Sequence, residues 1–234
     1  MTMEIVLESL LDGARRATGV VAVIDVLRAF TTAAVALANG AVRIVMVSGV
    51  EEALSLRASG VGQVCMGEVG GRAPPGFDFG NSPFELSRVD LRGKTLIQRS
   101  SAGTQGMVAA IQAEQRYAAS LVTASATARA LLATRSPRIT LVAMGKDADS
   151  RTDEDELCAM HLRNLLEGRP GDAASVQRLI RAGGEALRFG DPKRPWLHRA
   201  DLDIALDVDR YDFAVKVDMQ EGRPVACRQP PTAG

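Results

Sequence analysis

Short apolar runs alternate along this chain with longer stretches that favour helices. The clearest run, residues 20–24, is mostly β-branched and ends abruptly at Asp25, which predicts a buried strand followed by a sharp turn. An Ala-rich stretch follows at 33–38, and Asn39 and Gly40 close it with the left-handed end that suits a helix. Over the whole chain the pattern predicts strands at 3–7, 20–24, 42–47, 63–66, 94–98, 139–144, 213–217 and 225–228, a strand anchored by 121–122, and helices at 33–38, 50–59, 107–116, 125–134, 153–167, 172–189 and 195–206.

Strands and helices alternate about six times, which favours a mostly parallel sheet with helices on both faces, a three-layer α/β/α fold. The sequence contains no internal repeat, low-complexity segment or clear linker. We therefore expect a single α/β domain over residues 1–234, with a loose tail at 229–234.

Residues 67–83 break this pattern. The segment has no helical or strand period and holds five glycines and three prolines. A loop of this length inside a compact domain is usually functional or disordered, and its charged and aromatic residues argue against a flexible linker. We interpret it as an ordered site loop, with Pro83 starting a short helical turn.

Charge balance and cysteine count argue against several classes of protein. Lys and Arg number 28, as do Asp and Glu, so no basic excess points to nucleic acid. No apolar run approaches the roughly 18 residues of a membrane span, and the first residues lack the basic region of a secretory signal. The three cysteines are widely spaced and form neither a disulfide framework nor a zinc motif. We expect a cytoplasmic protein with no membrane partner.

Two acidic residues directly follow predicted strands. Asp25 and Glu68 would lie where open α/β sheets bind ligands, at the carboxyl ends of strands. Oxygen ligands beside an anion site suggest Mg²⁺. The alternative for Asp25 is that it only caps the next helix. For the acidic run at 147–156, a capping box from Thr152 to Asp155 and an ordinary first helical turn are the stronger alternative.

The turn at 100–106 offers hydroxyls and backbone amides at a predicted helix N-terminus, which would bind a phosphate or another anion. Arg28 and Arg99 favour an anion, although such a turn is often only a cap. Cys158 and His161 lie three apart on one predicted helix, but we expect a core cysteine and a surface histidine rather than a nucleophile pair. No Walker A, dinucleotide-binding, nucleophile-elbow or zinc-protease motif is present.

A series of ordered motifs matches a known family. They are Ile-Asp-Val-Leu-Arg-Ala-Phe-Thr-Thr at 24–32, Ala-Asn-Gly-Ala at 38–41, Gly-Glu at 67–68, Gly-Arg at 71–72, Phe-Asp-Phe-Gly-Asn-Ser-Pro at 77–83, Gly-Thr at 103–104 and Glu-Asp-Glu-Leu-Cys-Ala at 154–159. In type and order they resemble the 2-phosphosulfolactate phosphatase family, over most of residues 20–165.

The resemblance implies a Mg²⁺-dependent phosphatase of coenzyme M biosynthesis, which hydrolyses (2R)-2-phospho-3-sulfolactate to 3-sulfolactate and phosphate. It implies acid or metal roles for Asp25, Glu68 and Glu154. We hypothesise that Mg²⁺, held by Asp25 and one of the two glutamates, bridges phosphoryl oxygens, and that Arg28, the third expected catalytic residue, neutralises the remaining charge together with the amides at 100–106. A carboxylate orients the attacking water, or Asp25 itself attacks. The expected substrate or phosphate binders are Arg28, Thr31, Thr32, Asn81, Ser82, Ser100, Ser101, Gly103 and Thr104.

The sequence departs from the family pattern at two positions. Phe30 stands where a small polar residue is expected, and Ala102 replaces the Asn of a Thr-Asn-Gly-Thr turn. A non-catalytic protein that binds a phosphorylated metabolite is therefore the main alternative, and a partner-binding protein with the 67–83 loop as its interface is a third. A homodimer is consistent with this class of fold.

Overall fold

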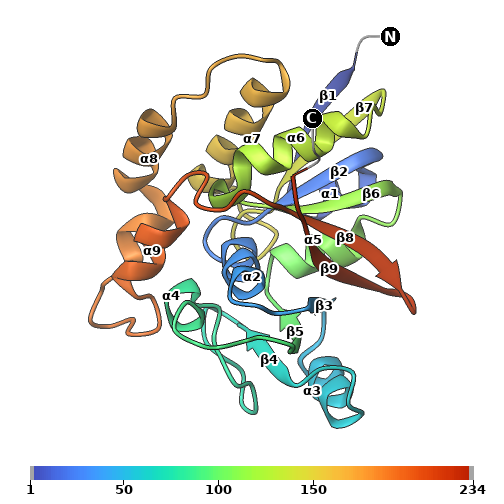
Figure 1. Ribbon diagram of the computed structural model, residues 1–234. Helices are drawn as coiled ribbons and strands as arrows, with labels where there is room; N and C mark the ends of the chain where they lie inside the picture. The colour runs from blue at the N-terminus through green and yellow to red at the C-terminus, as the bar shows by residue number, and fades with distance from the viewer. Residues whose placement is uncertain (1–2, 232–234) are drawn as a thin grey trace.

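The computed structural model describes residues 3–231, and the nine strands in this part of the chain form one sheet (Figure 1). Their spatial order is β1-β7-β2-β6-β8-β9-β3-β5-β4. The predicted α/β class with a mostly parallel sheet is confirmed. The strands are β1 (Glu4–Ser9), β2 (Gly19–Ile24), β3 (Arg43–Val47), β4 (Val64–Gly67), β5 (Thr95–Arg99), β6 (Ala113–Ala119), β7 (Arg138–Ala143), β8 (Ala214–Gln220) and β9 (Arg223–Gln229).

Two parallel groups of strands flank an antiparallel hairpin. Strands β1, β7, β2 and β6 run parallel, and so do β3, β5 and β4. The hairpin β8–β9 lies between the groups and pairs antiparallel with β6 on one side and β3 on the other. The late strands predicted at 213–217 and 225–228 are therefore the element that joins the sheet's two halves.

Helices cover both faces of the sheet (Figure 1), as expected from the central strand β2, whose six residues are all buried. Val21 and Val23 pack into the core that contains α2 and α5, whereas Val20, Ala22 and Ile24 pack into the core that contains α6 and α7. The helices are α1 (Leu10–Arg16), α2 (Ala29–Ala38), α3 (Val50–Ala58), α4 (Pro83–Leu86), α5 (Gly103–Ala109), α6 (Ala124–Ala133), α7 (Asp153–Leu166), α8 (Ala173–Arg181) and α9 (Arg199–Ala205), with 3₁₀ turns η1 (Leu121–Thr123) and η2 (Gly184–Arg188).

The helix predicted at 107–116 is wrong. Helix α5 lies earlier, and residues 113–119 form β6, while the strand expected around 121–122 is the 3₁₀ turn η1. The first half of β6 is polar and rich in helix formers, but pairing with β2 and β8 overrides this local preference. The helix predicted at 172–189 is two elements, because Gly184, the first residue of η2, adopts a positive φ of 59° that ends the helical path of α8.

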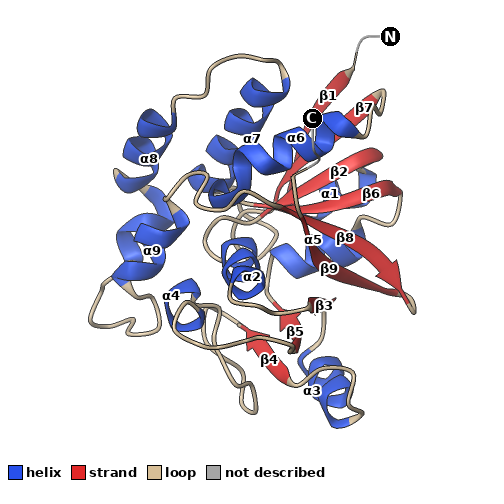
Figure 2. Cartoon of the chain, viewed as in Figure 1, coloured by secondary structure: helices blue, strands red, loops and turns tan. Residues whose placement is uncertain are grey.

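The loop predicted at 67–83 is present, and α4 begins at Pro83 as expected (Figure 2). Of the predicted loose tail, Gln229 belongs to β9 and pairs with Ala214, whereas 232–234 lie outside the described residues. None of the described helices combines the length and the apolar character that crossing a bilayer requires. The single-domain boundary and the cytoplasmic location stay predictions.

Candidate functional site

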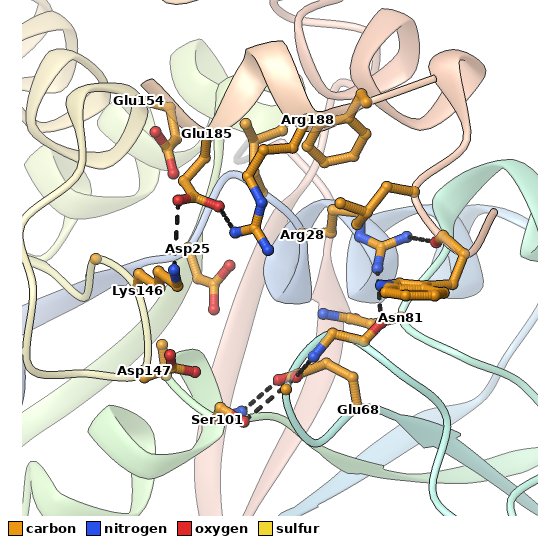
Figure 3. Close-up of a pocket in the computed structure, with 18 residues that line it drawn as sticks. Asp25, Arg28, Glu68, Asn81, Ser101, Lys146, Asp147, Glu154, Glu185 and Arg188 are labelled. Carbon is orange, nitrogen blue, oxygen red and sulfur yellow. Dashed lines mark hydrogen bonds and ion pairs between the residues drawn. The ribbon is translucent and has the colours of Figure 1, made fainter. Parts of the chain in front are cut away.

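A cavity of about 130 Å³ lies where β2, β4, β5 and β7 end, roughly ten times the space that one water molecule needs. Each of these strands sends the chain into the cavity wall within two residues of its end, so the wall collects side chains that are far apart in the sequence (Figure 3). The charged residues that line it are Asp25, Arg28, Glu68, Lys146, Asp147, Glu154, Glu185 and Arg188.

Asp25 lies at the meeting point of two helices. Its Oδ1 accepts from the backbone amide of Ala29 in α2 at 2.9 Å, and its Oδ2 accepts from Gly103 in α5 at 2.8 Å. Position 103 requires glycine because a Cβ there would lie 2.7 Å from Asp25 Oδ2. Asp25 therefore does accept hydrogen bonds at the start of helices, which was the alternative to a ligand-binding role, but it also faces the cavity.

Asp25 is the centre of a buried acidic cluster. Burial, with the Glu68 charge adding to it, raises the pKa of Asp25 to about 6, and burial, with the charges of Asp25 and Glu185, raises the pKa of Glu154 to about 7. Asp155 is also buried and its pKa is raised well above its ordinary value. This cluster is expensive to ionise completely, which is typical of sites that handle protons or cations.

Asp155 was not singled out by the sequence, because its acidic run resembles an ordinary helix start. The predicted capping box does not form, since Thr152 makes no side-chain capping bond. Instead Asp155 accepts from the amides of Val26 and Gly145, both at 2.8 Å, and so joins the turns that follow β2 and β7.

Arg28 is anchored on one side and open on the other. Its Nη1 donates to Asp201 Oδ2 at 2.6 Å and to the Trp196 carbonyl at 2.9 Å, and its Nη2 lies 3.4 Å from the Gly71 carbonyl. Among the described residues, Nε and the second Nη2 proton have no partner. A guanidinium has five N–H donors, so this free edge can bind two oxygens of an anion.

Asp201 is a functional residue that the sequence analysis missed. It is fully buried in α9, and besides Arg28 it binds the Ser82 hydroxyl at 2.6 Å and the Phe84 amide at 3.0 Å. One carboxylate thus holds the turn after β2 to the start of α4. The only local signal is that Asp201 lies on the same face of the predicted helix as Ala205, which is buried.

We expect Asp201→Ala to destabilise the protein by about 3 kcal/mol or more, because it leaves the Arg28 charge buried and unpaired. Urea unfolding followed by circular dichroism measures the change. Asp203→Ala is the matched control, since Asp203 lies on the same helix, is 55% exposed and pairs with Arg181 at the surface. An equal loss in the free energy of unfolding in the two variants would contradict the role of Asp201 as the partner of the buried Arg28 charge.

Glu68 ties the 67–83 loop to the turn after β5. Its Oε1 accepts from the Ser101 amide at 2.5 Å, and its Oε2 accepts from the Gly71 amide at 2.7 Å and lies 3.3 Å from the Ser101 hydroxyl. These bonds orient the carboxylate and leave one lone pair of Oε1 free to bind a ligand. The predicted site loop is therefore held at the cavity by a carboxylate that also lines it.

Asn81 lines the cavity with an unsatisfied amide. The residue is only 4% exposed, and its Oδ1 has no hydrogen-bond partner within the described part of the chain. A buried amide group without a partner costs free energy, so its presence in a cavity wall points to a ligand that satisfies it.

The predicted anion nest at 100–106 is occupied by the protein's own groups. The amides of Ser101 and Gly103 hold Glu68 and Asp25, and the Thr104 amide donates to Ser100 Oγ at 3.0 Å. The nest therefore uses two of its amides to orient carboxylates. Arg99 likewise is bound to backbone carbonyls, one of them Glu68.

Several predicted phosphate binders do not line the cavity. The hydroxyls of Thr31 and Thr32 donate to backbone carbonyls at 2.8 Å, and Ser82 caps α4 and binds Asp201. Their residue type suggested phosphate contacts, but helix-internal and capping bonds use these hydroxyls. Six predicted binders lie outside the lining: Thr31, Thr32, Ser82, Ser100, Gly103 and Thr104.

The two departures from the family pattern differ in their surroundings. Phe30 is 1% exposed and belongs to the hydrophobic core, whereas Ala102 lines the cavity.

Cys158 is buried in the core as expected, but His161 is only 4% exposed and neither of its ring nitrogens is bonded among the described residues. The surface position predicted for His161 is wrong.

The described residues contain no group of three or more His, Cys, Asp and Glu side chains arranged to hold a metal ion. Mg²⁺ needs only one or two carboxylates when waters and a phosphate complete its shell. The lining carries five carboxylates against three cationic side chains. A cation bound there would offset the carboxylate charge that faces an anionic ligand, and buried Asp25 and Glu68 fit that cation because backbone amides orient both.

Comparison with known proteins places the chain among relatives of similar length. The 2-phosphosulpholactate phosphatase family matches residues 6–187. A protein of Carboxydothermus hydrogenoformans described as "Probable 2-phosphosulfolactate phosphatase" is 42% identical over 219 residues, which cover 88% of this chain and 89% of that protein. Proteins of Deinococcus radiodurans and Bacillus subtilis with the same description are 36% identical over 174 residues (71% of this chain, 72% of theirs) and 30% identical over 198 residues (83% and 85%). The chain therefore belongs to the 2-phosphosulpholactate phosphatase family.

Proposed function

We propose that the protein is a Mg²⁺-dependent phosphatase that hydrolyses (2R)-2-phospho-3-sulfolactate to 3-sulfolactate and phosphate, a step of coenzyme M biosynthesis. The names of its relatives support the substrate. The observation that carries the proposal is the opposition, across one cavity, of the anchored Arg28 guanidinium and the buried acidic cluster around Asp25. A phosphate monoester needs both a cationic clamp and carboxylates that manage a cation and a proton.

The free edge of Arg28 would bind two phosphoryl oxygens. Because Asp201 and the Trp196 carbonyl already hold Nη1, the guanidinium loses little conformational entropy on binding. The unpaired Oδ1 of Asn81 lines the same cavity and would accept a hydrogen bond from a protonated phosphoryl oxygen or from a water molecule bound beside the phosphate. Both groups would place the phosphorus atom in the cavity that Asp25 faces.

Asp25 and Glu68 would hold Mg²⁺, which when bound withdraws charge from the phosphoryl oxygens. Their amide bonds keep the two carboxylates oriented before any substrate arrives. Asp25 is thus assigned as a cation-binding residue and not as the nucleophile in this proposal.

Glu154 would carry the proton. Hydrolysis adds water across the ester P–O bond: the water oxygen bonds to phosphorus, and one water proton moves to the leaving oxygen of the hydroxy acid. A carboxyl whose pKa is about 7 can accept that proton and return it near neutral pH. Much of the rate would still come from positioning and charge stabilisation, since phosphoryl transfer has a loose transition state.

Inorganic phosphate release from 2-phosphosulfolactate tests the proposal. We expect release that depends on added Mg²⁺ and that EDTA abolishes. Release that continues in EDTA would remove the cation from the mechanism. Thermal stabilisation by the compound without any release would instead support the alternative of a non-catalytic binding protein.

A further inference from the structure

Two cationic residues of the cavity wall have no role in the function proposed above. Lys146 lies on the loop after β7, and Arg188 ends the turn η2. Both pair with one carboxylate, Glu185: Lys146 Nζ lies 3.7 Å from Oε1, and Arg188 Nη1 bonds to Oε2. Figure 3 shows the three side chains around Asp25, above Asn81 and Glu68 in the view.

These cations differ from Arg28 in how they are held. The Arg28 side chain is 4% exposed, whereas those of Lys146 and Arg188 are 46% and 31% exposed. Ion pairs at this exposure contribute little net free energy, about 0 to 1 kcal/mol, because solvent screens them. Another anion can therefore replace Glu185 at little cost, while the buried pair of Arg28 and Asp201 stays intact.

Glu185 itself indicates what this part of the cavity accepts. Its carboxylate lines the cavity, and Figure 3 shows it beside Glu154 and near Asp25. A carboxylate held by two cations at that place occupies a site for a singly charged acidic group. A second acidic group on a ligand could take the same two donors.

We infer that Arg188 and Lys146 form a subsite for a second acidic group of the substrate, a carboxylate or a sulfonate, and that Glu185 holds the two cations until that group binds. The inference rests on the proposed function for the phosphoryl end of the ligand. It predicts selectivity for phosphate esters of small acids over phosphate esters of neutral alcohols. The reason is that separate cations bind the separate anionic groups of the ligand: Arg28 binds the phosphoryl group, and Lys146 and Arg188 bind the second acidic group.

The test compares four phosphate esters. 2-Phosphosulfolactate carries both acids, 2-phospholactate keeps only the carboxylate, the phosphate ester of isethionate keeps only the sulfonate, and ethyl phosphate has neither. We measure kcat/KM for phosphate release with each ester in the wild type, Arg188→Gln and Lys146→Gln. Arg169→Gln is the matched control, because Arg169 pairs with Glu167 at the surface and does not line the cavity.

We expect Arg188→Gln to reduce the selectivity ratio, which is kcat/KM for 2-phosphosulfolactate divided by that for ethyl phosphate, about 10- to 100-fold. Lys146→Gln should reduce it less, because its ion pair is longer, and Arg169→Gln should leave it unchanged. The single-acid esters show which acid the subsite takes. Ratios within twofold of the wild type in both cavity variants would overturn the inference.

A binding measurement separates this inference from the proposed function. Isothermal titration of the same esters in EDTA, where the proposed function expects no release, gives dissociation constants without turnover. If no ester is hydrolysed, the proposed function fails, and the ratio of the constants for 2-phosphosulfolactate and ethyl phosphate still decides the subsite. A ratio that both substitutions leave unchanged would exclude it.

Discussion

Asp25→Asn is expected to lower kcat for phosphate release by about 10³-fold. The substitution removes the charge at the centre of the acidic cluster while it keeps the size of the side chain. Asp25 is also a proposed Mg²⁺ ligand, so the stabilisation that Mg²⁺ gives to the wild type should disappear in the variant. Steady-state phosphate release measures the first effect, and the shift in Tm with added Mg²⁺ measures the second.

Asp218→Asn is the matched control for this experiment, since Asp218 lies in β8, is 57% exposed and pairs with Lys216 away from the cavity. It should keep wild-type kcat and the wild-type response to Mg²⁺. If Asp25→Asn retained more than about a tenth of kcat together with the Mg²⁺-dependent shift in Tm, the assignment of Asp25 would be wrong.

Glu154→Gln is expected to stabilise the protein at pH 8, by up to about 3 kcal/mol, while it reduces kcat at least about 100-fold. Burial raises the pKa of Glu154 from 4.5 to about 7 in the folded protein. Because the folded pKa lies above the unfolded one, the stability that Glu154 contributes is complete below pH 4.5 and is lost as the pH rises through 7. Glutamine does not ionise, so the variant does not lose this stability as the pH rises.

The free energy of unfolding, measured in urea at pH 4.5 and pH 8 in the presence of EDTA, tests this prediction. The free energy of unfolding of the variant should exceed that of the wild type at pH 8, and the difference should be much smaller at pH 4.5. Glu156→Gln serves as the control, because Glu156 lies on the same helix but is 36% exposed and accepts from the Ser9 hydroxyl. A gain of the same size at both pH values would show that ionisation of Glu154 is not its cause.

The sequence by itself determined the class of fold, the position of Asp25 and the site loop. These features are local: an apolar run that ends in an acidic residue predicts a strand and its turn, and a Gly- and Pro-rich segment predicts a loop. It also determined the family, because the motifs at 24–32 and 77–83 are short and contiguous. Residue type and order along the chain carry this information without any knowledge of packing.

Only the tertiary structure decided which of the candidate groups are free to act. The donors at 100–106 had the residue types of an anion site, but Asp25 and Glu68 occupy two of their amides. Arg28 owes its open edge to Asp201, a partner 173 residues away that no local pattern marks. Such roles depend on which hydrogen bonds remain unmade after folding, and long-range packing settles that question, not the residue types alone.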